Sequence, residues 1–342
     1  MPRVIRENEF AAKGANAKKA KTSKTNKDFD RYLTTIPVNG SVAVPAKNTF
    51  YFCPGPDPIM DRIPFAEWVD EDTYIIDTDK ITFIDGSVAV EGDFCVDTSE
   101  NYRRLYGNGL PNHNIGSFPI NKTSEAYKYY KGGLCPIGCF KDASEIDVNP
   151  YTLDITLPKN PVYNKEPTCI GYLTTGVATV TGVAFHVEYA ELGEGEAKRP
   201  NNPIALLPLD SCFGHPINNA YHYHAKSWEC FPDQGKANKH SPLFGYAIDG
   251  FGIFGQRTLG GKLVTNDDLD VCHGHIHEID WDGEKANMYH YHLNTEFPYS
   301  IGCFRGTPVK LDETLRTTCE LEEIKAVSFE NMTEVPIKKE CL

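Results

Sequence analysis

The sequence has no apolar run approaching 18 residues, so no part of it is expected to span a bilayer. It also has no excess of positive charge. Its 47 acidic and 34 basic residues give a formal net charge of −13, which argues against nucleic acid as a partner. Residues 1–30 contain no apolar stretch of the kind that a signal peptide requires. We therefore expect neither a nucleic-acid partner nor a membrane span.

The motifs of several enzyme classes are missing as well. The sequence contains no Gly-x-Ser-x-Gly nucleophile elbow and no phosphate-binding loop. The glycines from Gly250 to Gly255 fit the spacing of a dinucleotide loop, but the residues that follow do not favour a helix. Without a helix N-terminus nothing would hold a pyrophosphate, so we expect no nucleotide cofactor. Enzymatic activity is left open, with a non-catalytic role favoured.

Short runs of β-branched and aromatic residues, interrupted by glycine, proline, asparagine and aspartate, make up much of the sequence. This texture predicts a mainly β, loop-rich, sheet-like or sandwich-like domain, stapled by disulfides and with few short helices. Residues 151–158 alternate like a half-buried strand. Residues 171–191 predict two strands joined around a glycine, and residues 122–132 predict a short helix opened by a serine or threonine cap.

The composition changes along the chain and suggests four segments. These are a Lys-rich polar arm (1–30), a β extension (31–102), a main domain (103–306) and a charged C-terminal tail (307–342).

Eleven cysteines are spread along the chain, which favours long-range disulfides and an oxidising, extracellular compartment. The odd number leaves at least one thiol that is free, metal-bound or paired with another chain. Three Asn-x-Ser/Thr sequons, at Asn39, Asn121 and Asn331, are candidate glycosylation sites and agree with secretion.

The sequence also contains an internal repeat. Residues 210–231 and 270–304 both read Asp-x-Cys-x-Gly-His, then an insert of variable length, then Tyr-His-Tyr-His, then Cys-Phe. We refer to Tyr221–His224 as the first motif and Tyr289–His292 as the second motif. The repeat predicts two similar hairpins related by a pseudo-two-fold axis. Cysteines that flank each motif predict two local disulfides, Cys212 with Cys230 and Cys272 with Cys303, and the competing interpretation is a mixed Cys-His metal site.

Histidine is concentrated in these repeats, with nine of the eleven histidines between residues 215 and 292. Residues i and i+2 of a strand share a face, so each motif would place its imidazoles on one face and its phenols on the other. Imidazole clusters suit copper or zinc. The competing interpretation is that these histidines are only hydrogen-bonded core or surface groups. The candidate metal ligands are His215, His222, His224, His273, His275, His277, His290 and His292. The remaining histidines, His113, His186 and His240, are expected to be ordinary core or surface residues.

Six blocks between about residues 103 and 306 resemble the YHYH-domain family: the repeated Tyr-His-Tyr-His motif, and residues 107–120, 181–186, 241–255, 268–277 and 299–306. Gly252 and Phe254 depart from the residues that this family usually has there. The resemblance implies a compact, β-rich, usually secreted domain, and it brings no established reaction. Asn108, Asn112, His113 and Asp249 match other recurring polar positions of the family. Asp249 could orient a histidine beside a metal or cap its own turn, and we favour the turn.

Three functions remain open on the sequence alone. The leading hypothesis is an extracellular protein that binds copper or zinc through the paired hairpins and is non-catalytic. The second is a matrix protein that assembles into a homo-oligomer, filament or lattice and templates a mineral such as silica. The least favoured is a copper oxidoreductase with a motif tyrosine near the metal, which would need an open coordination position.

Overall fold

The computed structural model describes residues 51, 53, 81–131, 146–188, 190–192, 199–201, 207–311 and 338–342. The expected arm (1–30), Asn39 and Asn331 lie outside these residues, as does most of the charged tail. In the described part of the chain, no helix is long and apolar enough to cross a membrane.

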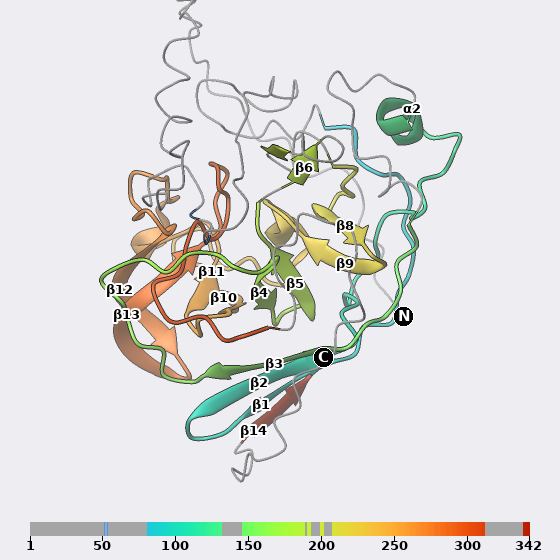
Figure 1. Cartoon of the computed structure of the whole chain (residues 1–342). Coiled ribbons are helices and arrows are strands. Elements are labelled where there is room, and N and C mark those ends of the chain that lie inside the picture. The colour runs from blue at the N-terminus through green and yellow to red at the C-terminus, as the bar shows by residue number, and fades with distance from the viewer. Residues whose placement is uncertain are drawn as a thin grey trace, which may run out of the picture.

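Two large β-sheets and one two-stranded pair form the described part of the chain, and helix there is confined to short pieces (Figure 1). The larger sheet has eight strands, in the order β12-β13-β11-β10-β4-β5-β9-β8. Their bounds are β4 Thr174–Ala178, β5 Val183–His186, β8 Gly214–Ile217, β9 Ala220–Tyr223, β10 Leu243–Ala247, β11 Gly252–Phe254, β12 Gly274–Trp281 and β13 Glu284–His292. The mainly β, sandwich-like fold predicted from the sequence is therefore confirmed.

The strand order of the large sheet reads as two equivalent halves that meet between β10 and β4, an antiparallel pair. In each half an antiparallel hairpin (β4–β5 or β10–β11) pairs in parallel, through its second strand, with a motif strand (β9 or β13). Each motif strand then pairs antiparallel with an edge strand, β8 or β12. The sequence repeat is thus one part of a larger repeat, which includes the hairpins β4–β5 and β10–β11.

Each of these inner hairpins turns at a glycine with positive φ. Gly182 (φ 82°) lies between β4 and β5, and Gly250 (φ 92°) lies between β10 and β11. Side chains with a Cβ rarely adopt this backbone conformation, so glycine fixes the position of both turns. The prediction of two strands joined around a glycine within residues 171–191 is confirmed.

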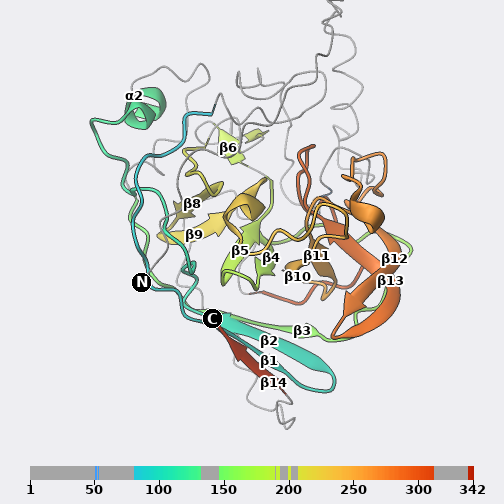
Figure 2. The same ribbon diagram turned by 180° about the vertical axis from the view of Figure 1, so that it is seen from behind.

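The smaller sheet has the order β14-β1-β2-β3, with β1 Phe94–Thr98, β2 Tyr102–Gly107, β3 Leu153–Pro158 and β14 Lys338–Cys341. It covers one face of the large sheet, as both views show (Figure 2). Phe94, Leu105 and Ile155 pack there against Tyr246 and other residues of the large sheet. A disulfide, Cys95–Cys341, joins β1 to β14.

The other face of the large sheet supports the main hydrophobic core, which includes all four motif tyrosines together with Phe185, Phe213, Ile253 and Tyr299. In β13 the side chains alternate, so Tyr289 and Tyr291 enter this core while His290 and His292 take the opposite face. The histidines therefore lie on the face that the smaller sheet covers at its centre. As the motifs predict, the phenols and the imidazoles of β13 lie on opposite faces of the sheet.

The remaining elements are short. Helix α2 spans Glu125–Lys131, and the Ser124 hydroxyl caps it by accepting from the backbone N–H of Tyr127 at 3.1 Å. This is the short capped helix that the sequence predicts. Two 3-10 helices cover Ser227–Cys230 and Leu259–Gly261, and strands β6 (Ala190–Leu192) and β7 (Arg199–Asn201) form a separate pair. Between residues 81 and 92, in the segment expected to be a β extension, the chain makes isolated bridges from Ile84 to Asp210 and from Val88 to Ile115.

Candidate metal centres

The two motif hairpins have the same register. In the first, Gly214 pairs with Tyr223 and His215 pairs with His222. In the second, Gly274 pairs with Tyr291 and His275 pairs with His290. His215, His222 and His224 are therefore equivalent to His275, His290 and His292. Because side chains of paired residues share a face, each hairpin brings three imidazoles together.

The aspartate of each repeat holds its hairpin in place. Asp210 accepts hydrogen bonds from the Tyr221 hydroxyl at 2.7 Å and from the N–H groups of Cys212 and Gly214 at 2.9 and 3.1 Å. Asp270 accepts hydrogen bonds from the Tyr289 hydroxyl and from the N–H group of Cys272, both at 2.9 Å. The first tyrosine of each motif is thus tied through a carboxylate to the cysteine loop, which fixes where the next histidine points.

The glycine of each repeat is required by this arrangement. A Cβ added to Gly214 would lie 2.1 Å from the Tyr221 hydroxyl oxygen, and one added to Gly274 would lie 2.4 Å from that of Tyr289. Both distances are far below van der Waals contact, so only glycine lets the phenol cross the neighbouring strand.

Two disulfides close the loops around the motifs. Cys212 is bonded to Cys230 and Cys272 to Cys303, and these are the pairings that the sequence predicts. His113 Nδ1 lies 3.6 Å from Cys212 Sγ, but sulfurs bonded to each other are not thiolate ligands for a metal. The group formed by His113, Cys212 and Cys230 is therefore a disulfide packed against a histidine.

The second tyrosine of each motif is also bonded on the face away from the imidazoles. The Tyr291 hydroxyl donates to Asp249 Oδ2 at 2.6 Å, and the same oxygen accepts from Gly306 N–H at 2.8 Å. The other oxygen of Asp249 accepts from Phe251 N–H in its own turn. Asp249 therefore caps its turn, as expected, and holds a tyrosine, not a histidine. Burial raises the pKa of Tyr291 well above its usual value, so the phenol stays neutral.

The first histidine cluster comprises His215, His222 and His224, each at most 3% exposed. One nitrogen from each ring lies within 4.8 Å of the others. His222 Nδ1 donates to the carbonyl of Ala220 at 3.2 Å, so Nε2 of this ring carries a lone pair. Neither ring nitrogen of His215 or His224 has a hydrogen-bond partner among the described residues. Four buried, unpaired imidazole nitrogens in one place require an explanation.

A carboxylate lies against this first cluster. Glu188 is 1% exposed, and its Oε1 accepts from Ala225 N–H at 2.7 Å. Its Oε2 lies 3.3 Å from His224 Nδ1, without hydrogen-bond geometry. A carboxylate beside one nitrogen of a histidine is the usual support for a metal ligand that uses the other nitrogen. His186 stacks on His222 with ring centroids 3.8 Å apart and planes inclined by 21°. Rings stacked in this way cannot both direct a lone pair at the same ion, so His186 packs against the cluster.

The second histidine cluster comprises His240, His275, His277, His290 and His292. Four of these, all except His275, have a nitrogen within 4.8 Å of one another. His275 Nε2 lies 3.0 Å from His292 Nε2. His240 Nε2 lies 3.4 Å from His290 Nε2. The Thr258 hydroxyl is 2.9 Å from His277 Nε2 at the edge of the cluster.

Backbone carbonyls fix the tautomers in this second cluster. His290 Nδ1 donates to Met288 O at 3.1 Å, and His240 Nδ1 donates to Ser241 O at 2.7 Å. A neutral imidazole has only one N–H, so the two Nε2 atoms that face each other both carry lone pairs. His292 Nδ1 donates to Gly255 O and His275 Nδ1 donates to Asp268 O. The facing Nε2 atoms of His275 and His292 therefore also both carry lone pairs, which repel each other. A cation between such lone pairs removes the repulsion.

Burial keeps the imidazoles of His275 and His290 neutral. It lowers the pKa of His290 to about 2 and that of His275 to about 4, with neighbouring histidines adding to the effect. In the first cluster burial lowers the pKa of His215 and His222 well below the usual value. Neutral imidazole is the form that binds metals.

One residue predicted as a ligand lies outside both clusters. His273 has φ 74°, as its equivalent Phe213 has φ 56°, and strand β12 begins only at the next residue. His273 therefore does not share the strand face of His275 and His277. Its Nδ1 donates to His292 O at 2.7 Å, and its Nε2 lies 3.0 Å from Oδ1 of Asn266. His273 is a hydrogen-bonded core residue.

His240 belongs to the second cluster, although the repeat does not predict it. His240 was expected to be an ordinary residue, since it lies 50 positions before His290 and belongs to neither repeat. The loop that enters β10 brings it to the cluster. Its inclusion in the histidine-rich span 215–292 was the available signal.

Comparison with known proteins agrees with the resemblance. A family model described as YHYH protein matches residues 154–262, about a third of the chain. The matched part includes the first motif and both inner hairpins, and the second motif lies beyond it. No curated protein and no solved structure matches the chain.

Proposed function

We propose that this chain, which carries a YHYH domain, holds transition-metal ions in two separate histidine sites, one in each half of its large sheet. The observation that carries the proposal is the set of buried imidazole nitrogens without partners at His215 and His224. The facing Nε2 atoms of the second cluster support it independently. Burial of such groups costs free energy unless something binds them.

The ligand set favours copper or zinc. Both clusters offer imidazole nitrogens, whereas calcium and magnesium prefer oxygen ligands. The first cluster supplies three histidines, and the second supplies four whose nitrogens lie within 4.8 Å of one another. Three or four imidazoles fit the tetrahedral coordination that zinc adopts in proteins.

The two sites cannot share an ion. Strand β9 and strand β13 are separated by five strand-to-strand steps, which is roughly 24 Å along the sheet. Each site instead ties a motif strand to the edge strand beside it: β9 to β8 in the first cluster and β13 to β12 in the second. This favours a structural role, in which metal binding contributes to folding stability.

An extracellular location agrees with the four disulfides of the described residues. Self-assembly, mineral templating and glycosylation stay predictions. Asn121 lies exposed ahead of α2, where its side-chain oxygen accepts from Thr123 N–H at 3.0 Å.

The test is the metal content of the full chain, purified without chelators and without immobilised-metal resin. We expect about two equivalents of copper or zinc per chain, and about one in each of two paired variants. The variants are His222→Gln with His224→Gln, and His290→Gln with His292→Gln. His113→Gln, outside both clusters, is the control and should keep the full content. Equal metal content in all four proteins would refute the proposal.

A further inference from the structure

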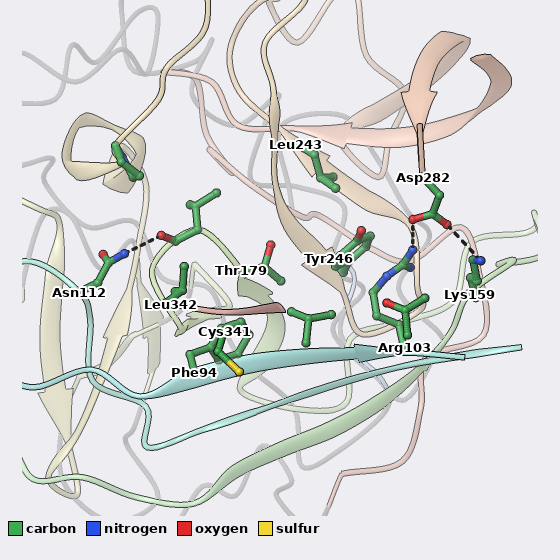
Figure 3. A pocket seen from close by; sticks show the side chains of 14 residues that line it. Phe94, Arg103, Asn112, Lys159, Thr179, Leu243, Tyr246, Asp282, Cys341 and Leu342 are labelled. Carbon is green, nitrogen blue, oxygen red and sulfur yellow. Dashed lines mark hydrogen bonds and ion pairs between the residues drawn. The ribbon is translucent and has the colours of Figure 1, made fainter. Parts of the chain in front are cut away.

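A cavity of about 530 Å³ lies between the two sheets (Figure 3). Strands β1 and β2 form one wall, with Phe94, Val96 and Arg103, and β10 forms another, with Leu243 and Tyr246. None of its lining residues is a histidine. Its volume is within the range of small-molecule sites.

The charged side chains of the cavity gather at one end. Arg103, only 1% exposed, forms an ion pair with Asp282 at 2.6 Å. Lys159 approaches the other carboxylate oxygen of Asp282 at 3.9 Å. Two cations therefore surround one anion, in a protein whose net charge is −13. Asn112 and the half-exposed Leu342 lie at the opposite end, as Figure 3 shows.

Arg103 also has hydrogen-bonding capacity to spare. Its Nη1 has no partner among the described residues, although its Nη2 is bonded to Asp282. The guanidinium lies over the Tyr246 ring at 4.0 Å from the centroid, which holds it in place. A buried guanidinium donor without an acceptor is costly, and a carboxylate is the acceptor that matches its planar geometry.

The walls next to this charged end are apolar. Leu243 and Tyr246 come from the large sheet, and Phe94 and Val96 come from the small sheet. We propose that the cavity binds a small amphiphilic carboxylate, with its head group at Arg103 and Lys159 and its apolar body between the two sheets. This site is independent of the metal sites.

Neighbouring arginines provide a matched pair of variants. Arg104 follows Arg103 on β2, but its side chain is half exposed and pairs with Asp154 at 2.6 Å. Arg103→Lys keeps the charge and removes the guanidinium, and Arg104→Lys makes the same change outside the cavity. Lys159→Met, at a partly exposed position, tests the second cation with less risk to folding.

Calorimetric titration of the full chain with decanoate, methyl decanoate and inorganic phosphate tests the proposal. We expect one saturable decanoate site, at least tenfold weaker binding of the methyl ester and of phosphate, and metal content unchanged by decanoate. Arg103→Lys and Lys159→Met should each weaken decanoate binding at least tenfold, and Arg104→Lys should not. Equal affinity for decanoate and its ester, equal affinity for decanoate and phosphate, or equal effects of the two arginine variants would overturn the proposal.

Discussion

Replacing His215 by leucine should have effects of opposite sign in the metal-free and the metal-loaded protein. His215 is 3% exposed, and neither of its ring nitrogens has a hydrogen-bond partner among the described residues. Leucine has a similar size and no polar atoms. Removing an unpaired buried polar group should relieve about 1–3 kcal/mol in the metal-free protein. The metal-loaded protein should lose the stabilisation that binding supplies, about 4 kcal/mol when free metal exceeds Kd a thousandfold.

His273→Leu is the matched control. His273 is also 3% exposed, but its Nδ1 donates to His292 O, whereas neither nitrogen of His215 has a hydrogen bond within the described part of the chain. Its loss leaves the His292 carbonyl without this hydrogen bond, which should cost about 1–3 kcal/mol. That cost should be the same with and without metal, because His273 belongs to neither cluster.

The assay is thermal unfolding of the wild-type chain and both variants, in chelator and in excess zinc. For a domain of this size, 1 kcal/mol shifts Tm by about 2–4 °C. His215→Leu should raise Tm in chelator and lower it in zinc, and His273→Leu should lower Tm equally in both. If His215→Leu lowers Tm in chelator as much as His273→Leu does, then His215 is an ordinary core residue and the argument from unpaired nitrogens fails.

Two further predictions concern the scaffold of the clusters. Gly214→Ala should destabilise the protein by about 2–4 kcal/mol in chemical denaturation, because its Cβ would displace the Tyr221 hydroxyl from Asp210. Gly260→Ala, where a Cβ meets nothing within 4 Å, should cost only the strain of its positive φ, and equal costs would contradict the packing argument. The metal-free protein should also lose stability as the pH falls below about 6.5, by about 1.4 kcal/mol per pH unit for each histidine with a strongly lowered pKa. The folded-state pKa of His290 is about 2 and that of His273 about 4, so the unfolded chain takes up these protons first. Denaturation midpoints that do not change between pH 7 and pH 5 would show that these imidazoles are not buried.

Local patterns in the sequence were enough for much of the fold. The alternation in each motif predicts opposite faces for imidazoles and phenols, because strand geometry depends only on residue spacing. The cysteines around each motif predict the pairs Cys212–Cys230 and Cys272–Cys303, because they close short loops around one hairpin. Gly182, inside a long β-branched run, marks a turn for the same local reason.

The repeat in the sequence was visible only where the same residue types recur. The hairpins β4–β5 and β10–β11 share few identities, yet they occupy equivalent places in the sheet. His186 and Phe254 illustrate why. Each ends the inner strand that pairs in parallel with a motif strand, and each packs against the motif histidines, but one is an imidazole and the other a phenyl ring. Packing at these positions requires a flat side chain and does not specify its chemistry.

By itself the sequence determined the residue types, their alternation along each strand and the two local disulfides, because these depend on neighbours in the chain. Only the tertiary structure decided the membership of each cluster. A positive φ at His273 turns it away from β12, and a loop brings His240 to His290 from 50 residues earlier. The cavity at Arg103 likewise exists only because two sheets, built from segments far apart in the sequence, pack face to face. Such distances between segments are set by packing, which no local pattern encodes.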